Sequence, residues 1–331
     1  MEKKSSGAAA QQQQHYLRRD ADESGMLVAG KHGDYRFVEK IGSGGYGAVY
    51  LAKREKEGGD DGGRLFACKI EYQAGRQEWQ LKLKLEVTIM REMAHARPPL
   101  DHFCRLIDWG RQPDNFNFII MSRVGPSVGE LLQRHRGTDF SLTSALRLAV
   151  QMVRALEQLH SIGYLHRDVK PSNFCIGLPE HSEAGKIYLI DFGICRRYAK
   201  VNGELLTPRV STAFKGTMRY ASRNSHAHKE LSRKDDVESW FYTLLEMTPG
   251  VQLPWTGRND KLEVLRLKRR LVGRRRLPKN CPAQYTAIVE HFDQLSIADK
   301  PDYSLLRRRL RDLLQRQGVR SDQPFEWELA T

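Results

Sequence analysis

The chain has 331 residues, 40% of them hydrophobic, and five cysteines that form no Cys-x-x-Cys pair. This length is enough for one large domain or two lobes, and the cysteine pattern argues against a disulfide framework or a zinc site and fits a reducing compartment. The formal net charge of +14 suggests an anionic partner, either nucleic acid or an acidic or phosphorylated protein. No apolar run reaches about 18 residues and the N-terminus lacks the apolar segment of a signal peptide, so we expect no membrane span and a cytoplasmic or nuclear protein.

The first part of the chain is predicted to be a tail followed by a sheet-rich lobe. Residues 1–30 are rich in Gln, Ala, Ser and charge, a composition typical of disorder. Alternating apolar residues on both sides of a glycine cluster then predict a β-hairpin, and residues 65–72 predict a third strand. Residues 78–93 alternate in part like a strand, but their length without Gly or Pro favours a helix. Two further strands are expected at 104–110 and 116–124.

After residue 125 the pattern becomes mainly helical. The segment 142–163 predicts a long helix that ends at a glycine. Two short apolar stretches, FCIG and KIYLI, predict a pair of strands. Further helices are expected at 231–247, 283–296 and 303–316. No internal repeat is present, so the sequence predicts a small β lobe joined to a larger α lobe.

The glycine cluster GSGGYG spans residues 42–47 and fits the pattern G-x-G-x-x-G. Alone this signal is weak, because dinucleotide-binding folds use the same pattern where a strand runs into a helix. Here strand patterns lie on both sides, so the glycines are predicted to lie at a hairpin tip. Such glycines let backbone N–H groups approach phosphates closely, although a plain flexible turn explains the cluster equally well when it is taken alone.

Lys69 lies inside the third predicted strand. If its side chain points inward, it needs a carboxylate and something anionic beside it. Glu86, on the inner face of the following predicted helix, is the natural carboxylate. Without the other motifs, an ordinary surface ion pair would be the simpler interpretation.

The segment HRDVKPSN, residues 166–173, combines an acid, bases and an amide on a loop that a proline stiffens. Phosphoryl transfer depends mainly on the positioning of charge. Asp168 can orient an attacking hydroxyl and accept its proton, and Lys170 can neutralise the transferring phosphoryl group. Asn173 can ligate a metal ion held between phosphates. This combination is specific for phosphoryl transfer.

A DFG tripeptide begins at Asp191, directly after an apolar predicted strand. Its aspartate would bind Mg²⁺, which bridges the phosphates of a nucleotide. The tripeptide is common by itself, but its order and spacing after the other three motifs make the set decisive.

Together these motifs resemble those of the eukaryotic protein kinases, over roughly residues 35–315. More narrowly, the sequence resembles the casein kinase 1 superfamily and, within it, the tau-tubulin kinase-like branch. The segments that carry the superfamily resemblance are HRDVKPSNF, KGTMRYAS (215–222), RKDDVESWFY (233–242), LPW (253–255) and DKPDYSLL (299–306). The segments KLEVTIM around Glu86 and SDQPFEWE (321–328) resemble the tau-tubulin branch.

The resemblance implies a bilobal kinase fold of class α+β that uses ATP and Mg²⁺. The N-lobe would span residues 31–124, the C-lobe 125–316, and a C-terminal extension 317–331. Met121 would be the gatekeeper, and Val124 would offer backbone hydrogen bonds to adenine. The full set of implied ATP-binding residues is Ile41, Gly42, Gly44, Gly45, Gly47, Val49, Ala67, Lys69, Met121, Val124, Cys175 and Ile190.

The resemblance also implies roles around the catalytic loop. Thr217 would bond to Asp168 and Lys170, which is the serine/threonine-kinase pattern, and Asp236 would support the loop through backbone contacts near its start. Asn173 and Asp191 would be the metal ligands. The implied catalytic residues are Asp168, Lys170, Lys69, Glu86 and Thr217.

Two basic clusters, at residues 268–276 and 307–311, admit three interpretations: a solvated helix face with a loop, a nuclear-import or nucleic-acid patch, or an anion pocket. The resemblance implies that Arg219, with Arg266 or a neighbour, holds acidic or prephosphorylated substrates. Arg223 departs from the family pattern and would add charge beside the substrate groove.

We therefore predict a monomeric serine/threonine kinase that acts on acidic or phosphorylated proteins. The alternative is a catalytically silent pseudokinase scaffold, which the intact catalytic set disfavours. A nucleic-acid-binding protein would rest on charge alone, because no recognisable reader module is present.

Overall fold

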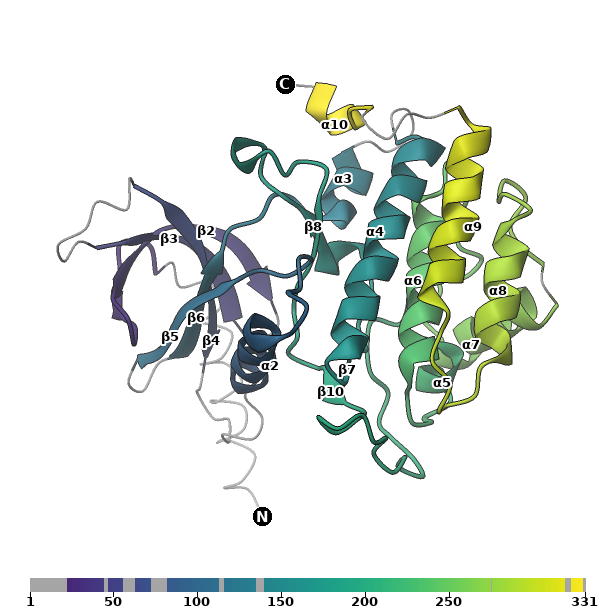
Figure 1. The fold of residues 1–331 in the computed structure, drawn as a ribbon, viewed down its shortest axis with the longest axis horizontal. Coiled ribbons are helices and arrows are strands. Elements are labelled where there is room, and N and C mark those ends of the chain that lie inside the picture. The colour runs from purple at the N-terminus through teal and green to yellow at the C-terminus, as the bar shows by residue number, and fades with distance from the viewer. Residues whose placement is uncertain are drawn as a thin grey trace, which may run out of the picture. The chain divides into compact units, whose positions relative to one another are not determined.

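The computed structural model describes residues 23–44, 47–55, 63–72, 82–112, 116–134, 140–274, 276–318 and 323–329. The chain divides into two compact units (Figure 1). The first unit extends to Pro99 and includes Cys104–Val124, and the second contains Leu100–Phe103 and the chain from Gly125 onward. This α+β division into a sheet unit and a helical unit is the fold class that the sequence predicted.

The first unit is built on a six-stranded antiparallel sheet with the strand order β1-β2-β3-β4-β6-β5. Its strands are β1 (Leu27–Ala29), β2 (Asp34–Gly44), β3 (Gly47–Arg54), β4 (Leu65–Tyr72), β5 (Leu106–Gln112) and β6 (Phe116–Ser122), and its helix is α2 (Leu83–His95). The predicted hairpin around the glycine cluster is confirmed, because β2 pairs antiparallel with β3. The predicted helix over 78–93 is confirmed from Leu83 onward and extends to His95, while residues 78–81 lie outside the described part of the chain.

Side-chain alternation in β4 divides the sheet into two faces. Phe66, Cys68, Ile70 and Tyr72 pack into an apolar cluster with residues from five other strands or segments. Ala67, Lys69 and Glu71 therefore lie on the opposite face, because successive side chains of a strand point to opposite sides. This second face carries the polar groups considered below.

One predicted boundary is wrong. The expected tail over residues 1–30 includes strand β1, where Val28 is fully buried and pairs with Tyr35 of β2. The physical reason is that Met26 and Val28 pack onto the core of the sheet while Leu27 between them is exposed, and the stretch is too short to show a period. Residues 1–22 lie outside the described residues.

The second unit is mainly helical, with two small strand pairs. Its helices are α3 (Val128–Arg134), α4 (Leu142–Ser161), α5 (Arg223–His226), α6 (Arg233–Met247), α7 (Lys261–Gly273), α8 (Tyr285–Gln294), α9 (Tyr303–Arg316) and α10 (Glu326–Leu329). Strand β7 (Tyr164–Leu165) pairs with β10 (Arg196–Arg197), and β8 (Phe174–Ile176) pairs with β9 (Ile187–Leu189). Figure 1 shows α4, α6 and α9 side by side, and α4 packs against both of the others.

Helix α4 is the centre of this unit. Ser141 caps its N-terminus by accepting a hydrogen bond from the backbone N–H of Ser144. The helix ends before Gly163, whose φ of +85° is the left-handed conformation that glycine adopts most easily. Among the described residues, no helix combines the length and apolar character that a membrane crossing requires.

Helix α7 was not predicted, and its sequence shows why. Its buried positions are Val264, Leu265, Lys268, Leu271 and Val272, which follow helical spacing with a lysine in the middle. The lysine and the surrounding arginines conceal this apolar stripe from a reading of hydrophobic period. The interpretation of residues 268–276 as a solvated face is therefore wrong for Lys268, which has no exposed surface, while Arg275 lies outside the described residues.

Candidate active site

The HRDVKPSN segment forms a loop between β7 and β8 that a buried carboxylate fixes from beneath. Asp236 of α6 accepts hydrogen bonds from the backbone N–H groups of His166 at 2.7 Å and Arg167 at 2.9 Å, as predicted. The imidazole Nε2 of His160 lies 2.8 Å from the same carboxylate. Burial alone would raise the pKa of Asp236, but the contacts with His160 and His166 lower it below its usual value. The ionised carboxylate can thus hold the loop rigidly.

Asp168, Lys170 and Thr217 form a closed triangle of hydrogen bonds. The Oδ1 atom of Asp168 accepts from both the backbone N–H and the hydroxyl of Thr217, each at 2.8 Å. Its Oδ2 accepts from the Lys170 ammonium at 2.8 Å, and that ammonium also donates to the Thr217 hydroxyl at 3.0 Å. The predicted bonds of Thr217 to both residues are confirmed. The Asp168 side chain is 13% exposed, so a carboxylate in a fixed orientation can still be reached from solvent.

Asn173 lies beside this triangle in a 3₁₀ turn that Pro171 begins. Its amide nitrogen donates to the Asp168 carbonyl at 2.8 Å, which leaves the amide oxygen as the acceptor that can serve a metal ion. The backbone N–H of Ile190 donates to the Asn173 carbonyl. This bond holds the segment that carries Asp191 beside Asn173. Asp191 has a φ of +67°, an unusual conformation for a residue other than glycine.

The donor set fits magnesium in one particular way. Asn173 and Asp191 offer oxygen atoms, the ligands that Mg²⁺ prefers. Within the described ranges, no group of three His, Cys, Asp or Glu side chains is placed to hold a metal ion by itself. A site with so few protein ligands suits an ion that completes its shell with water and substrate phosphates.

The first unit contains the predicted lysine–glutamate pair. The Lys69 ammonium lies 2.5 Å from Oε1 of Glu86, and the glutamate side chain is only 3% exposed. Glu71, two residues along the same face of β4, accepts hydrogen bonds from the backbone N–H groups of Lys82 and Leu83 at the start of α2. Strand β4 therefore holds α2 at two points. The role of Glu71 was not predicted from the sequence, although its spacing from Lys69 was the signal.

Three of the predicted ATP-binding residues of the first unit share the sheet face of Lys69. Val49 is the cross-strand partner of Lys69, and Ala67 is the partner of Met121. Ile41 is 49% exposed, as a residue in contact with a ligand can be. Gly42 pairs with Val49, and Gly44 pairs with Gly47 at the hairpin end. Gly45 lies outside the described residues.

Gly47 shows why this hairpin needs glycine. A Cβ atom at this position would lie 1.8 Å from the carbonyl oxygen of Ile70 on β4, a distance that no side chain can occupy. Val124 ends the first unit. In the second unit, Cys175 of β8 is buried and Ile190 directly precedes Asp191.

Hydrogen bonds of arginine residues anchor the segment between Asp191 and Thr217. The Arg167 guanidinium donates to the carbonyl groups of Ile194 and Cys195. Arg209 donates to the Glu230 carboxylate through its backbone N–H at 3.0 Å and through its side chain. Burial alone would raise the pKa of Glu230, but the bonds from Arg209 lower it to about 2. The segment is therefore anchored by groups of the unmodified chain.

The arginines predicted to bind an anionic substrate differ in their exposure and in their ion-pair partners. Arg219 pairs with Glu246 of α6 at 2.5 Å, and its carbonyl accepts from the Trp255 indole. Arg266 is exposed on α7. The charge predicted for Arg223 beside a groove is corrected by the structure, because Glu238 and Asp293 both pair with this side chain, which is only 20% exposed.

Lys268 supports the same segment from α7. Its ammonium donates to the carbonyl groups of Met218 at 2.9 Å and Ala221 at 2.6 Å. It also lies 3.2 Å from Nε2 of His226 and above the rings of Tyr242 and Trp255. Burial lowers the pKa of Lys268 to about 7. No family pattern or periodicity pointed to this role.

A sheet unit with a lysine–glutamate ion pair and a helical unit with this catalytic loop are the defining parts of the protein kinase fold. Residues 35–315 match the protein kinase domain family, and the chain belongs to that family. It is 37% identical over 308 residues to a probable serine/threonine-protein kinase of Dictyostelium discoideum, an alignment that covers 93% of this chain and 58% of that protein.

The chain aligns with a larger share of the length of two relatives from Caenorhabditis elegans. The chain is 30% identical over 318 residues to the serine/threonine-protein kinase spe-6, with 94% of this chain and 80% of spe-6 aligned. It is 32% identical over 247 residues to a putative serine/threonine-protein kinase, with 74% and 73% aligned.

Proposed function

We propose that the protein is a serine/threonine protein kinase that transfers the γ-phosphoryl group of ATP to hydroxyl groups of proteins. The observation that carries this proposal is the closed triangle of Asp168, Lys170 and Thr217 on a loop held by Asp236. The names of the aligned relatives support it.

Asp168 is the proposed catalytic base. Its Oδ1 is held by Thr217 and its Oδ2 by Lys170, so the carboxylate keeps one orientation toward an incoming hydroxyl. It would orient that hydroxyl and accept its proton as the phosphoryl group is transferred in line. Lys170 would neutralise negative charge on the transferring group.

The remaining residues would bind and orient the nucleotide. Lys69, held by Glu86, would contact the α- and β-phosphates, and the Gly42–Gly47 hairpin would cover them. Asn173 and Asp191 would hold Mg²⁺, which supplies charge neutralisation across the nucleotide phosphates. The apolar ATP-binding residues named from the sequence would contact the adenine base.

We also propose the narrower assignment to the casein kinase 1 superfamily and its tau-tubulin kinase-like branch. The motifs KGTMRYAS and DKPDYSLL support it. A preference for acidic or prephosphorylated substrates would follow from Arg219 and the exposed Arg266. Because Arg219 pairs with Glu246, a substrate anion would have to compete with that carboxylate. A monomer in the cytoplasm, or also in the nucleus, completes the proposal.

The first experiment measures phosphate transfer from γ-labelled ATP to casein and acidic peptides with Mg²⁺, for the wild type and for Asp168→Asn. The wild type should transfer phosphate, and the variant should lose about a hundredfold or more of the rate, because a positioned base contributes about that much. Binding of Mg-ATP is measured separately and should be retained in both proteins. A wild type that binds Mg-ATP without transferring phosphate would instead support the pseudokinase scaffold.

A further inference from the structure

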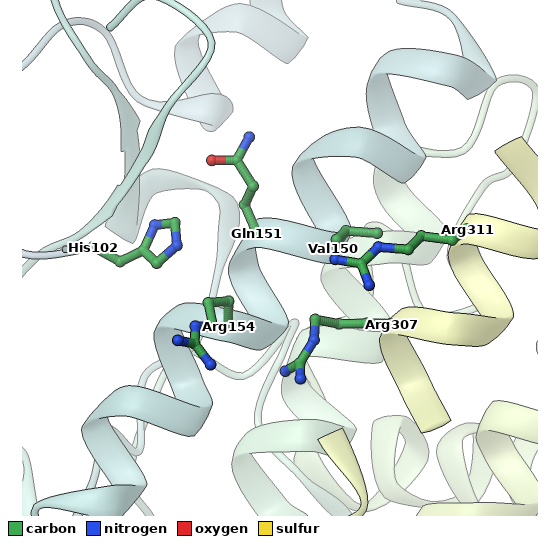
Figure 2. A pocket seen from close by; sticks show the side chains of 6 residues that line it. All are labelled: His102, Val150, Gln151, Arg154, Arg307 and Arg311. Carbon is green, nitrogen blue, oxygen red and sulfur yellow. The ribbon is translucent and has the colours of Figure 1, made fainter. Parts of the chain in front are cut away.

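A hollow of about 360 Å³ opens on the second unit beside helices α4 and α9. It is lined by His102, Val150, Gln151, Arg154, Arg307 and Arg311 (Figure 2). Its volume falls within the range of about 300–1,000 Å³ that is common for ligand sites in proteins. None of the residues proposed for phosphoryl transfer lines it, so its chemistry must be read from its own side chains.

Three arginines dominate the lining, and two helices supply them. Arg154 comes from α4, and Arg307 and Arg311 occupy successive turns on one face of α9. Figure 2 shows the two α9 side chains reaching toward α4. Because α4 packs along α9, the backbones that carry these guanidinium groups are fixed relative to one another.

The positive charges of the lining are only partly neutralised. Glu157 accepts from Arg154 at 3.3 Å and from Arg307 at 2.5 Å, so one carboxylate serves two guanidinium groups. Arg311 is exposed and forms no hydrogen bond or ion pair with any residue in the described part of the chain. Three guanidinium groups against the carboxylates of Glu157 and of Asp101, which interacts electrostatically with Arg154, leave an excess of one positive charge.

The other polar groups at the hollow are occupied. Gln151 donates to the Gly185 carbonyl and accepts from the Ile187 N–H. Nδ1 of His102 contacts the Ile187 carbonyl at 2.7 Å, and burial lowers the pKa of His102, so the ring is neutral at pH 7. Asp101, next to His102, accepts a hydrogen bond from Gln158, and its carboxylate also interacts electrostatically with Arg154.

We propose that this hollow binds the phosphate group of a phosphoserine or phosphothreonine in a protein. Such a phosphate carries a charge of about −1.5 to −2 at pH 7, opposite in sign to the excess charge of the lining. Guanidinium groups bind phosphate oxygens through paired, charge-assisted hydrogen bonds. The lining offers no free amide to read a base and no aromatic ring except His102 to stack on one, which disfavours a nucleotide.

This inference rests on the proposed function in one respect. A kinase makes phosphate monoesters on proteins, so a site for them on the same unit would retain a substrate that has already been modified. The kinase would then modify such a substrate repeatedly. The binding itself requires no catalysis and can be tested separately.

The test measures binding of a fluorescent degenerate peptide pool with a central phosphoserine, and of the same pool with serine. The full chain carries Arg219→Ala throughout, so that the other proposed anion site cannot supply the binding. Within this background, Arg154→Gln with Arg311→Gln should weaken phosphopeptide binding about tenfold or more, as expected for lost charge-assisted bonds. Arg309→Gln is the matched control: it removes the same charge from an exposed position of α9 outside the hollow, and should change binding less than twofold.

Two further measurements identify the source of the phosphate and separate this proposal from the proposed function. Free inorganic phosphate should compete only weakly, and vesicles with phosphorylated inositol headgroups should not bind in preference to the peptide. Phosphate transfer to an unphosphorylated peptide should be the same with and without the Arg154 and Arg311 substitutions.

Several results would overturn the proposal. These are equal binding of the serine and phosphoserine pools, equal loss in Arg309→Gln and the double variant, or preferential binding of inorganic phosphate or vesicles. An inactive kinase that still shows Arg154- and Arg311-dependent phosphopeptide binding would refute the proposed function and leave this site standing.

Discussion

The hydroxyl of Thr217 contacts both members of the charged pair at the catalytic loop. It donates to Asp168 and accepts from Lys170, while the Thr217 backbone N–H makes a separate bond to the same carboxylate. Replacing the hydroxyl with a methyl group therefore removes one bond to each charged side chain and leaves the backbone contact in place.

Thr217→Val should lower kcat by about tenfold to a hundredfold, because a hydrogen bond to a charged group contributes about 1.5–3 kcal/mol. The dissociation constant of Mg-ATP should stay unchanged, since no nucleotide contact is proposed for this residue. Steady-state kinetics and nucleotide titration provide the two readings, and Thr217→Ser should restore most of the rate. A valine variant with full activity would show that the triangle does not orient the base.

A substitution at Arg219 tests the proposed substrate preference. Arg219→Ala should weaken the use of phosphoprimed peptides more than that of unprimed ones, because it removes the proposed partner of the priming phosphate. Glu246→Gln should have the opposite effect, since it removes the carboxylate that now pairs with Arg219. The measurement is kcat/KM for matched primed and unprimed peptides, and equal losses on both would sink the idea.

At the scale of elements, helix α7 is fixed to the segment around Arg219 by one buried lysine. Lys268 donates to two backbone carbonyls of that segment. A buried ammonium is costly, and the lowered pKa of about 7, against a usual 10.5, expresses that cost. Burial and the nearby ammonium lower the pKa of His226 to about 4. This ring therefore adds no positive charge at neutral pH.

The lowered pKa of Lys268 determines how the free energy of unfolding changes with pH. Between pH 7 and 10.5 the unfolded chain holds the proton of Lys268 and the folded chain releases it. The free energy of unfolding of the wild type, relative to Lys268→Met, should therefore rise with pH through this window, by at most about 1.4 kcal/mol per pH unit. Urea unfolding of both proteins from pH 6 to 9 measures the difference, and a flat or falling difference would contradict the buried charge.

The catalytic loop could be predicted from the sequence because its parts are contiguous. Asp168, Lys170 and Asn173 lie within one short segment, and their types and spacing suffice to identify the chemistry. The pair of Lys69 and Glu86 was predictable for a similar reason, since a strand and the next helix carry it.

The carboxylate partners of two arginines, Arg219 and Arg223, could not be predicted. The partners of Arg219 and Arg223 lie on α6 and α8, and a local sequence pattern does not show that these carboxylates neutralise the two arginines. Strand β1 and helix α7 were missed because one is too short and the other too basic to display a hydrophobic period. In each case tertiary packing determines the outcome.

For the whole molecule, the charge of +14 is distributed between internal pairs and an exposed remainder. Arg209 and Arg223 are paired with carboxylates of the second unit. Exposed arginines remain on α7 and α9, at positions 266, 269, 270, 308, 309, 311 and 316. Both proposed anion sites draw on these two helices, so the two proposals assign part of the excess charge to phosphorylated or acidic protein partners.

In the proposed mechanism, Asp168 activates a serine or threonine hydroxyl for phosphoryl transfer. The most direct measurement compares peptides of one sequence with a single serine, threonine or tyrosine acceptor, using wild type and Asp168→Asn with labelled ATP and Mg²⁺. We expect labelled phosphoserine and phosphothreonine, little phosphotyrosine, and a loss of about a hundredfold or more in the variant. Equal use of tyrosine, or equal rates in the two proteins, would contradict it.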